Sequence, residues 1–113
     1  MNKATVYITQ DNNKNYAPAH NYGVPTFITN LEYESICNSA NNRNIHSDIR
    51  KFVSTFNPEV DYVLLSGDPV VIGLVINAAF SISGSVQVLK WSSQDRMYVP
   101  MTLEETQEGV VDR

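Results

Sequence analysis

DYVLLSGDPVVIGLVINAAFSISG, residues 61–84, is the stretch that decides the predicted fold. It opens with an almost uninterrupted apolar run at residues 61–65, which is typical of a strand buried on both faces. Residues 70–82 then have scarcely a polar side chain, and Ser83 and Gly84 end that run. The stretch therefore predicts a buried strand, a tight turn and an apolar helix.

The turn in this stretch consists of residues 66–69. Gly67 can adopt backbone angles that other residues resist, which suits a tight turn. Asp68 can cap the first free N–H groups of the helix, and Pro69 fits the first helical turn. We therefore expect the helix to begin directly after the turn.

The chain has 113 residues, of which 42% are apolar and 18% are charged. This size and composition predict one folded domain with a single core. We expect the domain to span residues 1–103 and the acidic residues 104–113 to form a frayed tail. The net charge of −4 arises mainly in that tail, so the sequence predicts no basic surface for nucleic acid.

Cys37 is the only cysteine, which excludes an intrachain disulfide. The first residues lack the long apolar core of a signal peptide. The longest apolar run, near residues 70–80, is shorter than the roughly 20 residues that span a bilayer. We therefore expect a cytoplasmic protein without a membrane partner.

Three further segments are rich in β-branched and aromatic residues and predict strands, at residues 4–10, 25–29 and 85–91. A helical crossover separates the last of these from the strand at 61–65, so the two are predicted to be parallel. Residues 96–103 return antiparallel, and Pro100 places them at the sheet edge. The predicted fold is a single small α/β domain with a mostly parallel central sheet of four to five strands, an antiparallel C-terminal edge hairpin and two to three helices.

An amphipathic helix is predicted from apolar side chains at helical spacing, on Ile45, Ile49, Phe52, Val53 and Phe56. A capping-box spacing at residues 29–32 predicts a brief helical turn before it. The Asn-rich residues 38–44 are predicted to interrupt or restart the helix, because asparagine side chains compete for the backbone. For the same reason we expect residues 11–24 to form a long loop.

The turn of Ser66, Gly67 and Asp68 is the candidate ligand site. In open α/β sheets, ligands bind beyond the carboxyl ends of the strands, where helix N-termini offer free N–H groups. Thr9 and Gln10 end the first strand, and they lie on the same rim if the two strands are neighbours. We predict that these five residues bind a small anionic ligand. The alternative is that Asp68 only caps its helix.

No cofactor is predicted for this turn, because it lacks both the glycine spacing of a dinucleotide fingerprint and the lysine of a phosphate-binding loop. His20 and His46 lie far apart, and no Ser, Cys or carboxylate stands at a catalytic spacing from either. The acidic residues are dispersed without metal-ligand spacing. The sequence therefore favours a protein that is not an enzyme, with surface histidines and no metal site.

Trp91 and Tyr98 lie on the two arms of the C-terminal hairpin. They predict either a partner-binding surface or the inner face of the sheet, because aromatic side chains are common in both. The apolar helix at residues 70–82 also needs cover on more than one side. That cover is either the Asn-rich loop with the amphipathic helix or a second copy of the chain, and we favour the homodimer.

The segments DYVLLSGDPVVIGLVI, VQVLKW and YVPMTL, and more loosely VYITQ and NYAPAHNYG, resemble those of small α/β proteins of unassigned function encoded by tailed bacteriophages. The resemblance implies a location in the host cytoplasm and a role in host takeover or counter-defence. The first function hypothesis is accordingly a non-enzymatic accessory protein that binds a host protein. The alternatives are a binder of a small ligand or nucleotide at residues 66–69 and a structural or assembly protein.

Overall fold

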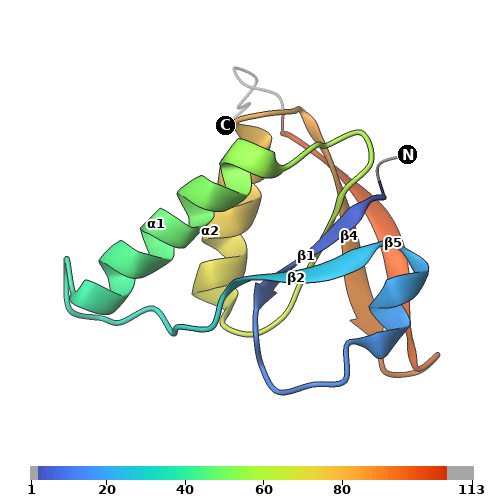
Figure 1. Cartoon of the computed structure of the whole chain (residues 1–113), viewed down its shortest axis with the longest axis horizontal. Coiled ribbons are helices and arrows are strands. Elements are labelled where there is room, and N and C mark those ends of the chain that lie inside the picture. The colour runs from blue at the N-terminus through green and yellow to red at the C-terminus, as the bar shows by residue number, and fades with distance from the viewer. Residues whose placement is uncertain (1–2, 107–113) are drawn as a thin grey trace, which may run out of the picture.

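The computed structural model describes residues 3–106, which form five strands, two α-helices and a short 3-10 helix (Figure 1). The strands are β1 (Thr5–Gln10), β2 (Val24–Thr29), β3 (Tyr62–Leu64), β4 (Ser85–Ser92) and β5 (Met97–Glu104). The helices are α1 (Ala40–Thr55), α2 (Pro69–Phe80) and the 3-10 helix η1 (Ala17–Asn21).

The strands form one sheet in the order β2-β1-β3-β4-β5. β1 pairs in parallel with both β2 and β3, and β3 pairs in parallel with β4. β5 runs antiparallel to β4, with Ser85 opposite Glu104 and Ser92 opposite Met97. These pairings confirm the predicted fold class, and they confirm that Pro100 lies in an edge strand.

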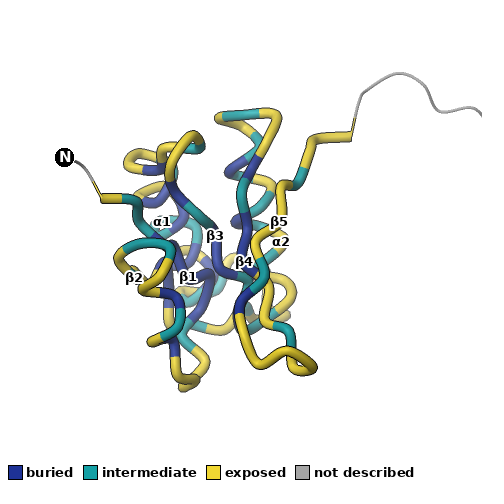
Figure 2. The backbone as a smooth tube through the Cα atoms, turned by 90° about the vertical axis from the view of Figure 1, so that its right-hand side faces the viewer, coloured by how far each residue is buried: buried dark blue, intermediate teal, exposed yellow. Residues whose placement is uncertain are grey.

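Helices α1 and α2 both cover one face of the sheet, which we call the helical face (Figure 1). Residues 11–23, which include η1, cover the opposite face, which we call the loop face. Because successive strand residues point to opposite faces, Val63 packs in the helical-face core and Leu64 in the loop-face core. Buried positions are concentrated on the central strands β1, β3 and β4 (Figure 2).

Helix α2 has its cover within the chain. Its fully buried side chains are Val71, Val75 and Ala79, which belong to the helical-face core together with residues of β3, β4 and α1. The sheet and α1 thus supply the two covers that an almost wholly apolar helix requires. The predicted homodimer stays a prediction, but α2 does not require it.

Helix α1 begins within the Asn-rich residues 38–44, which agrees with the second of the two alternatives, a helix that starts again there. The Asn-rich residues 38–44 do not interrupt it, because Ser39 caps the helix by accepting a hydrogen bond from the Asn42 N–H (3.1 Å). The Asn42 side chain is buried and binds the preceding loop, with hydrogen bonds to the N–H of Glu34 (2.7 Å) and the carbonyl oxygens of Glu34 (2.9 Å) and Ile36 (3.3 Å). These contacts with the loop outweigh the weak helix propensity of asparagine.

The prediction of a brief helical turn at residues 29–32 is wrong. Thr29 is the last residue of β2, and its hydroxyl accepts a hydrogen bond from the Leu31 N–H (3.2 Å) instead of capping a helix. Among the described residues, no helix has the length and apolar character needed to cross a membrane. The predicted frayed tail falls mostly on residues 107–113, which lie outside the described residues.

Replacing Asn42 with Ala tests whether the Asn42 amide stabilises the start of α1. The substitution leaves the backbone groups of Glu34 and Ile36 without their partner and should lower the free energy of unfolding by about 1–3 kcal/mol. Asn44→Ala is the matched control, because Asn44 is exposed on the same helix. Urea denaturation of both variants measures the difference. Equal stabilities would contradict a structural role for the Asn42 amide.

Candidate functional site

The carboxyl ends of β1 and β3 lie side by side, because the two strands are paired neighbours in the sheet. The two connections that follow these ends cross opposite faces of the sheet. The connection from β1 to β2 crosses the loop face, and the connection from β3 to β4 crosses the helical face. Such a divergence is where open α/β sheets bind ligands. The expectation that Thr9 and Gln10 lie on the same rim as the turn after β3 is confirmed.

Thr9 binds the turn with a buried hydroxyl. Its Oγ1 accepts a hydrogen bond from the N–H of Ser66 (2.9 Å) and donates one to the carbonyl oxygen of the same residue. Both residues are buried, with exposed fractions of 0% for Thr9 and 6% for Ser66. This pair of hydrogen bonds continues the contact between β1 and β3 beyond the last paired residues.

Gln10 connects the turn to the loop that follows β2. Its Oε1 accepts a hydrogen bond from the Asp68 N–H (2.6 Å), and its Nε2 donates one to the carbonyl oxygen of Leu31 (2.7 Å). Asp68 caps α2 as predicted, because its carboxylate accepts from the Val70 N–H (2.9 Å), and it also accepts from the Tyr33 N–H (3.2 Å). We call Thr9, Gln10, Ser66, Gly67 and Asp68 the junction.

The N–H groups of Ser66, Asp68 and Val70 thus already have protein partners. This arrangement agrees with the alternative in which Asp68 acts as a helix cap. An anion bound by these N–H groups would have to displace the side chains of Gln10 and Asp68. Ligand binding by the turn itself stays a prediction.

A pocket of about 430 Å³ lies beside the junction on the loop face. The sheet contributes Leu64, Leu65, Ser66, Trp91 and Tyr98 to its wall, and the segment before β2 contributes Lys14, Asn15 and Pro18. The pocket therefore brings Ser66, from the predicted ligand site, together with the two residues of the predicted partner site. The other four residues of the junction do not line it.

Trp91 and Tyr98 stand opposite each other in the β4–β5 pair, but they differ in exposure. Tyr98 is 5% exposed and belongs to the loop-face core, whereas Trp91 is 41% exposed at the pocket rim. Their rings meet edge to face, with centroids 5.0 Å apart. The two alternatives from the sequence thus apply to different residues: Tyr98 lies on the inner face, and Trp91 is available for contact.

Three hydroxyl groups approach the inner wall of the pocket. Tyr16 and Ser66 share a hydrogen bond between their hydroxyls (2.9 Å), and the Tyr16 oxygen also accepts from the Asn12 N–H (2.9 Å). No described residue hydrogen-bonds the Tyr98 hydroxyl, and every fully enclosed side-chain oxygen among residues 3–106 has a partner, so this hydroxyl is accessible to solvent. The Tyr98 hydroxyl is therefore open to the pocket. Burial and, second, the neighbouring Tyr16 phenol raise the pKa of Tyr98, so it is a hydrogen-bond donor at neutral pH.

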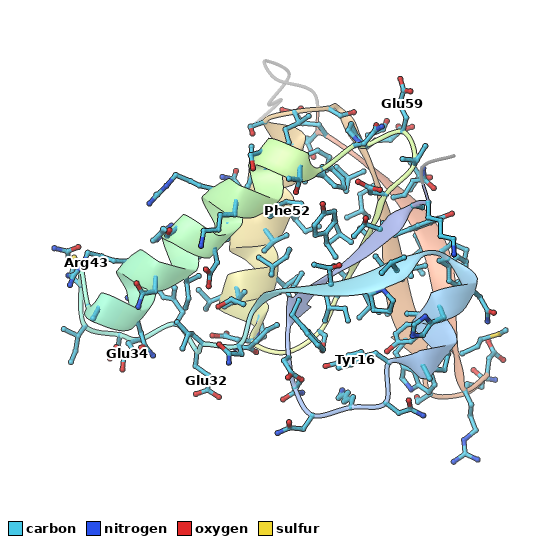
Figure 3. The ribbon with its side chains drawn as sticks, in the orientation of Figure 1. Tyr16, Glu32, Glu34, Arg43, Phe52 and Glu59 are labelled. Atoms are coloured by element: carbon cyan, nitrogen blue, oxygen red, sulfur yellow. The ribbon has the colours of Figure 1, made fainter. Side chains whose placement is uncertain are left out.

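Three residues of the Asn-rich segment that were not expected at the site from the sequence lie at or beside the pocket: Lys14, Tyr16 and Pro18. Tyr16 (Figure 3) is 8% exposed, packs in the loop-face core and contacts the Phe27 ring edge to face. The signal in the sequence is the presence of aromatic residues within an otherwise polar segment, since buried aromatic side chains fix such a segment to the sheet.

The residues considered for catalysis do not gather at the pocket. His46 is within hydrogen-bond distance of the Tyr33 hydroxyl (3.1 Å), and His20 and Cys37 are exposed. Glu32 and Glu34 are exposed on the loop before α1, and the exposed Glu59 lies far from both (Figure 3). Within residues 3–106, no group of three His, Cys, Asp or Glu side chains is arranged to hold a metal ion.

Fold and pocket together define a small open α/β domain with a ligand-sized pocket at the carboxyl ends of its strands. A family model described as Phage Pam3 gp32-like protein matches residues 4–105. The chain belongs to this family, which confirms the resemblance to small phage-encoded proteins. Searches of curated proteins and of solved structures find no match.

Gly67→Ala tests whether the junction requires glycine. Gly67 has a φ of +88°, and a Cβ atom there would lie 2.0 Å from Gln10 Oε1. The substitution should therefore lower the free energy of unfolding by about 2 kcal/mol or more, through the left-handed backbone and the lost hydrogen bond. Gly73→Ala is the control, because nothing lies within 4 Å of its added Cβ. It should stabilise α2 by about 1 kcal/mol. Thermal denaturation showing similar changes in both variants would contradict this role of Gly67.

Alkaline titration tests the environment of Tyr98. Its pKa in the folded protein is above the ordinary value of 10.0, so the unfolded chain loses this proton first as the pH rises. The contribution of Tyr98 to the free energy of unfolding should therefore be constant below about pH 10 and fall above it. The phenolate absorbance of the wild type minus that of Tyr98→Phe isolates this group. A difference curve with its midpoint at or below 10.0 would contradict the assignment.

Proposed function

We propose that this phage protein is a non-enzymatic accessory protein that binds a protein of the infected cell, in the host cytoplasm, as part of host takeover or counter-defence. Membership of a phage family supports the setting. The observation that carries the proposal is the exposed apolar surface of the β4–β5 hairpin. We call Met97 and Met101, on the helical-face side of the hairpin, together with the part of Trp91 that borders the hollow beside Met101, the hairpin surface.

The hairpin surface has the composition of an interface core. Trp91, Met97 and Met101 are 41%, 52% and 42% exposed, although each has a large apolar side chain. Tryptophan and methionine are enriched in interface cores, and methionine adapts to irregular partner surfaces. Trp91 and Met101 also border a hollow of about 340 Å³ at the end of the hairpin. A bulky side chain of the partner fits such a hollow, as the anchors of protein interfaces do.

Pro100 supports contact through side chains over pairing with a second copy of the chain. It lies in the edge strand β5, opposite Leu89, and has no N–H to donate. An edge strand interrupted in this way resists extension of the sheet by another molecule. The proposed partner therefore packs on the hairpin surface instead of adding a strand to the sheet.

Affinity capture from the lysate of host cells tests the proposal. The hairpin variant carries Met97→Lys and Met101→Lys, which place charges on the hairpin surface and should reduce capture of a host protein by about tenfold or more. The control variant carries Ile36→Lys and Val60→Lys, which make the same chemical change at apolar side chains that are 71% and 45% exposed outside the hairpin. Both variants should retain the melting temperature of the wild type.

Lysates of uninfected and infected cells distinguish the kinds of partner. A host partner is captured from both lysates, and mass spectrometry identifies it. A partner captured only from infected cells and encoded by the phage would contradict the proposal and favour an assembly role. Equal capture by the wild type and the hairpin variant would contradict the assignment of the surface.

A further inference from the structure

We propose that the pocket between Trp91, Tyr98 and Lys14 binds a small planar aromatic anion, such as a nucleoside monophosphate or an aromatic carboxylate. The pocket lies at the carboxyl ends of β3 and β4, where open α/β sheets bind ligands. Its volume of about 430 Å³ is within the range of small-molecule sites.

The rim of the pocket offers an aromatic ring for stacking. The Trp91 indole is 41% exposed, and its edge-to-face contact with Tyr98 restrains its orientation. Leu64, Leu65 and Pro18 supply apolar surface around it. The flat face of an aromatic ligand can stack on the Trp91 indole, regardless of which atoms the ligand ring contains.

The inner wall offers a hydrogen-bond donor without a protein acceptor. Tyr98 is 95% buried, since its exposed fraction is 5%, and no described residue hydrogen-bonds its hydroxyl. Since every fully enclosed side-chain oxygen among residues 3–106 has a partner, this hydroxyl is accessible from the pocket side, and a ligand acceptor can replace the water that would otherwise bind it. The neighbouring Ser66 hydroxyl is already held by Tyr16 (2.9 Å), which fixes its position in the wall.

The charge of the lining selects an anion. Lys14 is the charged residue among those that line the pocket, and it is exposed at the mouth. One cation and one free hydroxyl match a ligand with a single anionic group, whereas a triphosphate requires several cations or N–H groups. The N–H groups of Ser66, Asp68 and Val70 already have protein partners.

This inference shares Trp91 with the hairpin surface but uses neither Met97 nor Met101, so it can be tested separately from the proposed host partner. Trp91 is the only tryptophan of the chain, so its fluorescence reports directly on the pocket. Titration to about 1 mM covers the affinity expected for a ligand of this size. The probes are adenosine and guanosine monophosphates and phenylacetate, with the uncharged nucleosides and phenylacetamide as matched neutral compounds, and excitation at the red edge of the indole band avoids absorption by the probes.

We expect at least one anion to change the Trp91 fluorescence and to bind about tenfold more tightly than its neutral counterpart. Tyr98→Phe keeps the ring and should weaken binding by about tenfold, whereas Tyr62→Phe, which changes a tyrosine outside the pocket lining, should not. Lys14→Gln should remove the preference for the anion, whereas Lys51→Gln on α1 should keep it. The Met97→Lys, Met101→Lys variant should bind the ligand as the wild type does.

The monophosphates and the carboxylate distinguish a nucleotide ligand from an aromatic acid. Absence of a fluorescence change with every probe at about 1 mM would overturn the inference. Equal binding of anions and neutral compounds would overturn the role of Lys14. Unchanged affinity in Tyr98→Phe, with a melting temperature like that of the wild type, would overturn the role of the hydroxyl.

Discussion

The side chains of Thr9 and Gln10 hold the end of β1 against the turn that starts α2, and the rest of the structure depends on this buried contact. A buried amide or hydroxyl destabilises a protein unless it is hydrogen-bonded, so these side chains specify one position of the turn. Gln10 binds the Asp68 N–H and the Leu31 carbonyl oxygen together, which fixes the turn relative to the loop that leads to α1. Gly67 allows the close approach, because any Cβ atom at that position would overlap the Gln10 amide. The start of α2, the pairing of β1 with β3 and the path of the chain after β2 thus have one common support.

The pocket follows from the same arrangement. Both long helices cover the helical face, so among residues 3–106 the loop face has only the segment 11–23 to cover it. This segment is anchored by Tyr16, whose hydroxyl binds Ser66 in the junction, and by Tyr22, whose hydroxyl donates to the Tyr98 carbonyl oxygen (3.3 Å). A segment without a long helix covers less of the sheet than a helix does, and the uncovered space between it and β4 is the pocket. The residues that fix the fold therefore also shape the candidate site.

Patterns within one segment were sufficient to predict the fold class, but not the order of the strands in the sheet. The apolar run at residues 61–65, the Asp68 cap and Pro100 at the sheet edge each depend on neighbours in the sequence, and each is confirmed. Whether residues 38–44 interrupt or restart the helix stayed open in the sequence, because the Asn42 side chain that decides it is bound by a loop eight residues away. The rim shared by Thr9 and Ser66 was predictable from parallel pairing. The pocket was not, because Lys14 and Pro18 reach it only through the tertiary anchoring of Tyr16, and no local pattern in their segment indicates that anchoring.

Trp91 connects the two proposed activities. It borders the pocket on the loop face and also the hollow beside Met101 at the end of the hairpin. Met101 lies opposite Val88, which belongs to the helical-face core, so the methionine and the pocket are on different sides of the same strand pair. The proposed ligand and the proposed partner would thus contact different atoms but share one indole, whose orientation Tyr98 restrains. If ligand binding shifts that indole, the affinity for the partner changes, and linkage requires the partner to change the ligand affinity by the same factor. The test is to measure the affinity for the ligand with and without the partner, and the affinity for the partner with and without the ligand. Changed affinities indicate a phage protein that senses a metabolite, whereas unchanged affinities indicate that the pocket and the hairpin act independently.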